Sequence, residues 1–165
     1  MIKSIRVYAL LAAGLLLIQS CGFHLRGAGT DPANVQAVYL HGTGADRIQR
    51  ILQQQLGEAV KTNRSAAAYE IIVSNENFRQ NVISVSAVTG KVEEFNINYS
   101  CLLNIARIDS DAAELINNQR ISLSKDYTFD EDAVLSKFEE QRTIEKDLVA
   151  EAARNIIRRF NAVAN

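Results

Sequence analysis

The chain has 165 residues, with 18 Lys and Arg against 19 Asp and Glu, and a formal net charge of −1 at pH 7. This near-neutral balance argues against a general nucleic-acid binder, which meets phosphates with a strongly basic surface. Two cysteines permit one intrachain disulfide at most, and the length suits a single domain with its own core.

The first 20 residues are typical of a cleaved export signal. Lys3 and Arg6 precede an almost unbroken apolar stretch over 7–18. That stretch has the length of a signal-peptide core and is short for a membrane span, which needs about 20 apolar residues. The alternatives are a hydrophobic core helix and an uncleaved anchor. Cleavage after residue 20 removes two basic residues, so the net charge of residues 21–165 becomes −3.

Cys21 stands where the apolar stretch ends. Residues 18–21, Ile-Gln-Ser-Cys, resemble a bacterial lipobox, in which the cysteine thiol and the amine freed by cleavage both become acylated. Two or more acyl chains anchor a protein stably, whereas one chain does so only marginally. We therefore predict that Cys21 is lipidated, with S-diacylglycerol and N-palmitoyl groups. The alternatives are a buried thiol and a disulfide with Cys101.

The segment over 21–34 is predicted to be a tether, because it has no helical or strand period and contains Pro32, the only proline. Its second residue is Gly22 and not aspartate. By resemblance to lipoprotein sorting in Gram-negative bacteria, this choice favours the outer membrane. A single α+β domain is then expected over 35–165.

A strand and a helix are predicted at the start of that domain. Residues 35–42 are apolar on both faces, which fits a short buried strand. Thr43 precedes Asp46 by three residues, a weak capping-box signal for a helix over 45–61. One face of this helix is expected to be apolar: Ile48, Ile51, Leu52, Leu56 and Val60.

Three strands are predicted next. Residues 68–87 are rich in β-branched side chains, and a phase shift near 74–77 predicts a bulge. A turn over 88–91 leads to a strand over 92–108 with clear alternation, and a third strand follows over 118–130. The core side of the second strand carries Phe95, Ile97, Tyr99, Cys101, Leu103 and Ile105, with Cys101 as a small buried hydrophobe.

A long final helix is predicted over about 132–162, capped by Asp130, with Phe138 and Ile144 as anchors of its first half. Its second half carries an apolar stripe: Leu148, Val149, Ala152, Ala153, Ile156, Ile157 and Phe160. The element order is β-α-β-β-β-α. We predict an α+β two-layer sandwich, with two helices on one face of a four-stranded, mostly antiparallel sheet and a polar opposite face.

No catalytic constellation is present in the sequence. His24 and His41 have no metal-ligand spacing with each other or with Cys101. There is no nucleophile elbow, P-loop or dinucleotide-binding turn, and the carboxylate runs are typical of solvated surfaces. The sequence therefore predicts no catalytic residue, no cofactor and no metal, and favours a binding or scaffolding protein over an enzyme.

The heptapeptide over 21–27, Cys-Gly-Phe-His-Leu-Arg-Gly, resembles the start of the LPS-assembly lipoprotein LptE family. The order of elements after it also fits that family. The resemblance implies an outer-membrane lipoprotein that faces the periplasm, binds lipopolysaccharide and sits as a plug inside an LptD-like β-barrel. Such a complex inserts lipopolysaccharide into the outer leaflet.

Lipopolysaccharide carries phosphates and carboxylates, so its site needs lysine or arginine. Lys137 matches a basic position of the family at the start of the last helix, and Lys91 lies near the expected basic turn, where Val88 and Thr89 stand instead. For both lysines the alternative is an ordinary surface charge.

The tether motif of Gly22, Phe23, His24, Leu25, Arg26 and Gly27 is expected to dock against barrel or bilayer, or else to be read only by the export machinery. A different class of function is a stand-alone envelope scaffold lipoprotein without a lipid ligand. That alternative predicts neither a barrel partner nor saturable lipopolysaccharide binding.

Overall fold

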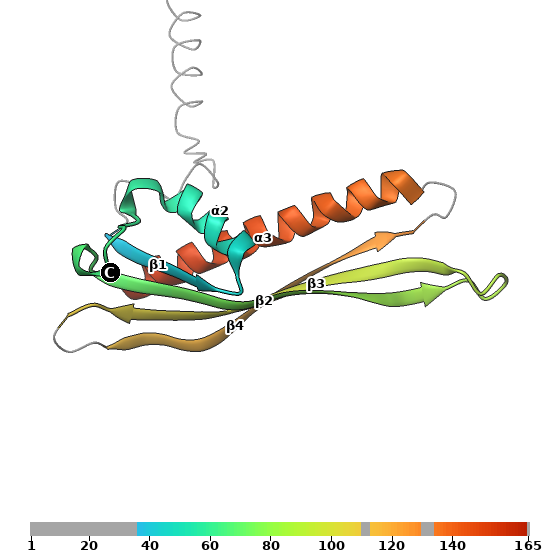
Figure 1. The fold of residues 1–165 in the computed structure, drawn as a ribbon. Helices are drawn as coiled ribbons and strands as arrows, with labels where there is room; N and C mark the ends of the chain where they lie inside the picture. The colour runs from blue at the N-terminus through green and yellow to red at the C-terminus, as the bar shows by residue number, and fades with distance from the viewer. Residues whose placement is uncertain (1–35, 110–112, 130–133, 165) are drawn as a thin grey trace, which may run out of the picture. The chain divides into compact units, whose positions relative to one another are not determined.

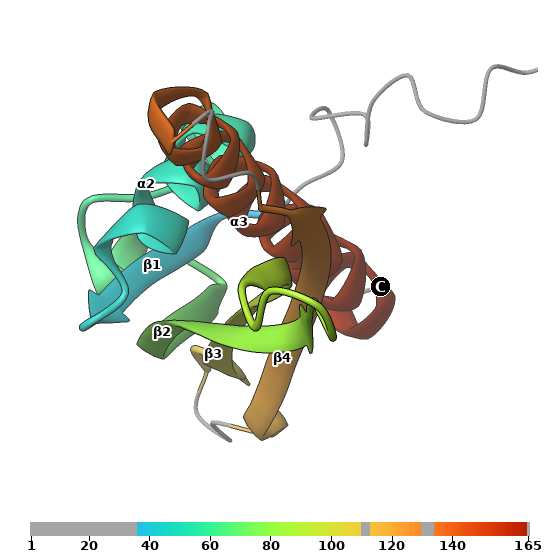
Figure 2. The same cartoon turned by 90° about the vertical axis from the view of Figure 1, so that its right-hand side faces the viewer.

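Two helices cover one face of a four-stranded sheet (Figures 1 and 2). The computed structural model describes residues 36–109, 113–129 and 134–164. The elements are β1 (Val38–Thr43), α2 (Asp46–Leu56), β2 (Tyr69–Val85), β3 (Val92–Arg107), β4 (Glu114–Thr128) and α3 (Val134–Ala164). The predicted order and the α+β class are confirmed. The expected signal peptide and tether, with Cys21, and the Asp130 cap lie outside the described residues.

The sheet has the order β1-β2-β3-β4. β1 pairs with β2 in parallel, and the two remaining pairs are antiparallel. Parallel neighbours need a crossover connection, and α2 with the turns after it supplies this one. β1 pairs only with residues 69–74 of β2, so within the described residues the second half of β2 has β3 as its single neighbour.

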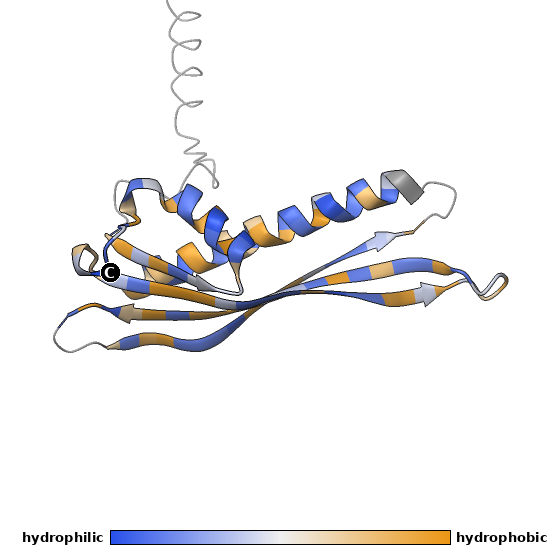
Figure 3. Cartoon of the chain, viewed as in Figure 1, coloured by the Kyte–Doolittle hydropathy of each residue, from blue (hydrophilic) through white to orange (hydrophobic). Residues whose placement is uncertain are grey.

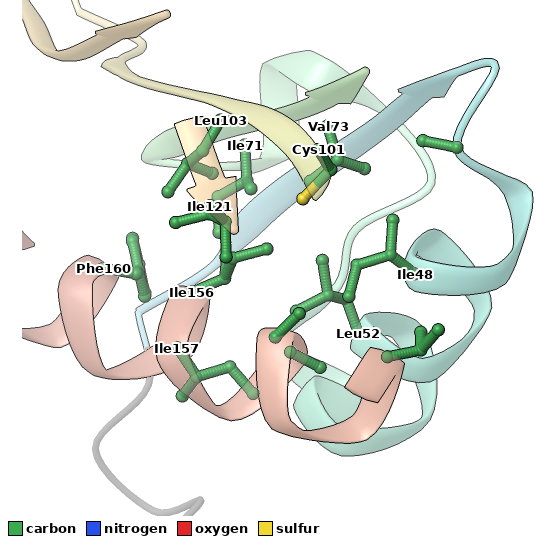
Figure 4. Packing of buried hydrophobic residues seen from close by; sticks show 14 of the residues in the cluster. Ile48, Leu52, Ile71, Val73, Cys101, Leu103, Ile121, Ile156, Ile157 and Phe160 are labelled. Atoms are coloured by element: carbon green, nitrogen blue, oxygen red, sulfur yellow. The ribbon is translucent and has the colours of Figure 1, made fainter. Parts of the chain in front are cut away.

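The core lies between the sheet and the helices (Figure 4). Ile48 and Leu52 of α2 and Ile156 of α3 face the inner side of the strands, and all three are fully buried. The predicted stripe of α3 is buried along its whole length. Cys101 is buried on β3 with a free thiol, and burial raises the pKa of that thiol. The prediction of a small buried hydrophobe is therefore confirmed.

The opposite face of the sheet is polar. On β3 the odd-numbered residues from Ile97 to Ile105 are buried, so the even-numbered ones point away from the helices. Asn96 on this face donates a 2.6 Å hydrogen bond to Asp126 of β4. Figure 3 shows the resulting alternation of polar and apolar bands along the strands.

Two boundaries and one burial pattern differ from the prediction. α2 ends at Leu56 because Gly57 has φ +52°, outside the right-handed helical region. β4 begins at Glu114 and not at 118, since Asn118, with φ +46°, interrupts the alternation beside a register shift. β1 is buried on one face only, because it is an edge strand and both helices lie on the same side.

The first half of α3 contains one correct and one wrong anchor. Ile144 is 3% exposed, as expected, but Phe138 is 59% exposed. An α-helix has about 3.6 residues per turn, so the position two turns before Ile144 on the buried face is 137. Lys137 takes that position, and Phe138 points away from the sheet.

The predicted bulge in β2 is confirmed between Ser74 and Asn77, and it presents Glu76 to the start of α2. The Glu76 carboxylate accepts hydrogen bonds from the backbone N–H groups of Arg47, at 3.0 Å, and Ile48, at 3.2 Å. The Tyr99 hydroxyl donates a third, at 3.1 Å. The predicted capping box is wrong: α2 has no side-chain cap from its own N-terminal segment. A carboxylate from another element satisfies these helix donors instead.

Glu76→Ala is expected to lower the free energy of unfolding by about 2 kcal/mol, because the change removes a charged acceptor of three hydrogen bonds. Urea unfolding of the full chain, followed by circular dichroism, measures this. The matched control is Thr43→Ala, which removes the locally predicted cap and is expected to cost less than about 0.5 kcal/mol. Equal costs for the two variants would contradict the cap assigned to Glu76.

Candidate functional site

One end of the domain contains the β2–β3 hairpin turn, the end of β4 and the start of α3 (Figure 1). The turn closes with hydrogen bonds from Ser86 N–H to the Lys91 carbonyl and from Gly90 N–H to the Ser86 carbonyl, both 2.8 Å. Gly90 has φ +72°, which glycine adopts without strain. We call this part of the domain the hairpin end.

The structure places both predicted lysines at the hairpin end, on different elements. Lys91 is exposed at the end of the turn. Lys137 lies in the first turns of α3 with its side chain 19% exposed, and its Nζ is 2.8 Å from the Glu140 carboxylate. The Glu140 carboxylate therefore already neutralises part of the Lys137 charge, and an incoming anion has to compete with it.

An aromatic cluster lies at the hairpin end, at the start of β3 and the end of β4. The Phe95 and Tyr127 rings stack with centroids 5.7 Å apart, and Phe129 meets Phe95 edge-on at 5.3 Å. Gln80 Nε2 donates a 3.0 Å hydrogen bond to the Tyr127 hydroxyl. Burial raises the pKa of Tyr127, and Glu140 adds to the rise, whereas the positive charge of Lys137 opposes it. Lys137 and Glu140 therefore affect the pKa of Tyr127 in opposite directions.

Large apolar side chains are exposed at the same end: Val82, Ile83, Val85, Val88 and Phe138. Val88, at the tip of the turn, is 94% exposed. The sequence prediction did not identify this exposed group, because β-branched residues in a strand do not by themselves indicate which of them stay exposed. A signal was available in the lengths: the strand predicted over 68–87 is far longer than the strand predicted over 35–42, and in the structure β1 pairs only with the first half of β2.

The tether motif and Cys21 lie outside the described residues, so their roles stay predictions. Among the residues that the structure describes, no three His, Cys, Asp or Glu side chains gather as they would around a metal ion. In the same part of the chain, no helix is both long enough and apolar enough to cross a bilayer.

Several solved structures share this fold. Rare lipoprotein B from Shewanella oneidensis is 20% identical, with a TM-score of 0.63 over 76% of this chain and 93% of that one. A minor lipoprotein from Acinetobacter baumannii is 16% identical, with a TM-score of 0.61 over 78% and 92%. An uncharacterised lipoprotein B from Nitrosomonas europaea is 22% identical, with a TM-score of 0.57 over 83% and 88%.

A search of curated proteins found no match to the chain. A sequence profile of one family does match, and its description is "LptE: Lipopolysaccharide-assembly". The match extends over residues 31–160 and thus includes all four strands, α2 and α3 as far as Phe160. The chain therefore belongs to the LptE family of lipopolysaccharide-assembly proteins.

Proposed function

We propose that this chain is an outer-membrane lipoprotein, anchored through acyl chains on Cys21, that binds lipopolysaccharide and plugs an LptD-like β-barrel. The complex would transport lipopolysaccharide and insert it into the outer leaflet. The observation that carries the proposal is the family match over residues 31–160. The role is one of binding and assembly, without catalysis by this chain.

The hairpin end has the chemistry that an anionic lipid requires. Lys137 occupies a core-facing position of α3, while Phe138 beside it is exposed. Burial alone favours the opposite arrangement, so this inversion supports a functional role. The ammonium groups of Lys137 and Lys91 suit phosphates and carboxylates. The exposed valines and Phe138 suit acyl chains or an apolar partner surface.

The rest of the domain is compatible with a plug. A polar sheet face suits the water-lined lumen of a large barrel, whose inner wall is itself polar. Several acyl chains on Cys21 would hold the chain at the membrane without a spanning segment. The second half of β2, which β1 does not reach, and the hairpin turn then remain available for the ligand.

The proposal is tested by pulling down the tagged full chain from detergent-solubilised outer membranes and identifying the co-purifying proteins by mass spectrometry. An abundant, roughly equimolar LptD-like barrel is expected. A chain that purifies from the outer membrane without a barrel, and without saturable lipopolysaccharide binding, would leave the stand-alone envelope scaffold as the better explanation.

Lys137→Glu is expected to weaken lipopolysaccharide binding about tenfold or more, because a hydrogen bond to a charged group contributes about 1.5–3 kcal/mol. Lys91→Glu is expected to have a smaller effect, since exposed charges are screened by solvent. Titration of the full chain in detergent with lipopolysaccharide measures both variants.

Glu140→Gln is expected to change the affinity for lipopolysaccharide in the opposite direction. It removes the carboxylate 2.8 Å from Lys137, so the affinity for lipopolysaccharide is expected to rise. Lys61→Glu, in the segment after α2, is the charge-matched control and is expected to leave binding unchanged. Equal losses for Lys61→Glu and Lys137→Glu would indicate a general charge effect and contradict the site.

A further inference from the structure

A basic cleft lies between α2 and α3, which pack against each other in the helical layer. Its volume is about 390 Å³. The lining residues are Arg47, Arg50 and Ile51 of α2, and Arg142, Glu145, Lys146 and Val149 of α3. Each helix contributes positions three and four apart, which lie on one helical face. Two faces of neighbouring helices thus form one concave site.

The cleft has more positive than negative charge. Arg47 donates to Glu145 at 2.9 Å, and its guanidinium lies 5.0 Å from the centroid of the Phe78 ring. Arg142 pairs with Glu139 at 3.1 Å. Within the described part of the chain, Arg50 and Lys146 have no ion-pair or hydrogen-bond partner. The positive charges of Arg50 and Lys146 are therefore left for a ligand, and Arg47 beside them is already held in place.

We propose that this cleft binds a phosphate monoester on a sugar-sized group. A phosphate monoester has about −1.5 to −2 charge at pH 7, which matches two uncompensated cations. Guanidinium groups bind phosphate oxygens through paired N–H donors. The volume lies in the range of small-molecule sites, roughly 300–1,000 Å³, and is too small for a folded segment. Ile51, which is partly exposed, offers an apolar surface to the C–H groups of a sugar ring.

The site goes beyond the proposed function and does not rest on it. Lys137 lies at the start of α3, whereas the cleft residues of α3 lie further along the helix and line the space between it and α2. The same phosphate chemistry occurs in free sugar phosphates and in lipid headgroups, and these two sources are separated by experiment.

The test is a titration of the ¹⁵N-labelled full chain in non-ionic detergent, followed by NMR. Glucose 1-phosphate is expected to give saturable shifts in the amides of 47–51 and 142–149, and glucose is expected to give none. The double variant Arg50→Gln/Lys146→Gln is expected to raise the dissociation constant at least tenfold. Arg159→Gln, an exposed change on α3 outside the cleft, is expected to leave it unchanged, as is Lys137→Glu.

A parallel titration uses dihexanoyl phosphatidic acid, which presents a phosphate monoester on a lipid. Tighter binding of this lipid, still lost in the double variant, assigns the site to a lipid headgroup. Tighter binding of glucose 1-phosphate assigns it to a free sugar phosphate. The proposal is overturned if neither compound gives saturable shifts, or if binding survives in a folded double variant with an unchanged thermal unfolding midpoint.

Discussion

Cys21→Ser is expected to remove all lipid from the chain and to deplete it from the outer membrane. The sulfur of Cys21 is the only atom of this residue that can form the thioether to diacylglycerol, and serine has no sulfur. Without that modification, we expect residues 1–20 to remain attached. Intact-mass spectrometry measures the missing acyl groups and the retained residues 1–20 at once, because lipidation adds mass and cleavage removes it. Membrane fractionation measures the depletion from the outer membrane.

The matched control is Cys101→Ala, since Cys101 is the only other cysteine. Cys101 is buried on β3 and free, so its replacement is expected to leave acyl mass and membrane fractionation unchanged. Loss of lipid in both variants would indicate that destabilised protein is degraded before it is processed. A Cys21→Ser chain that is still cleaved after residue 20 would favour an ordinary export signal over the lipobox.

The fold was predictable wherever an element buries one face. The alternation around Cys101 and the stripe that ends at Phe160 each follow from a layer of helices on one side of a sheet. The bulge at 74–77 was also visible, because it shifts the phase of the alternation. These features are local, so the sequence pattern alone determines them.

Features that depend on distant partners were not predictable. Glu76 caps α2 from 28 and 29 residues further along the chain than the two N–H groups it accepts from, after the bulge has turned its side chain towards the helix start. The exposure of Val82 depends on how far β1 extends along β2. The basic cleft exists because Arg50 and Lys146 come together when α2 packs on α3. No periodicity in either helix indicates this pairing.

The two phenylalanines of α3 have different surroundings: Phe160 lies in the core, and Phe138 is exposed at the hairpin end. Phe160 is completely buried, and its ring meets Tyr69 edge-on at 5.4 Å. Phe160→Ala is expected to lower the free energy of unfolding by about 3–5 kcal/mol, through lost burial and the cavity that remains. The total free energy of unfolding of a typical domain is only about 5–15 kcal/mol, so this variant should be close to unfolding at moderate temperature. Urea unfolding of the full chain measures the change.

Phe138→Ala is the control of the same residue type on the same helix. Because Phe138 is 59% exposed, the variant is expected to change the free energy of unfolding by less than about 1 kcal/mol. If the hairpin end binds lipopolysaccharide, the same variant should weaken that binding while the fold stays intact. A large loss of stability would instead mean that Phe138 packs against the domain, and that the core of α3 extends further towards its start than its exposure indicates.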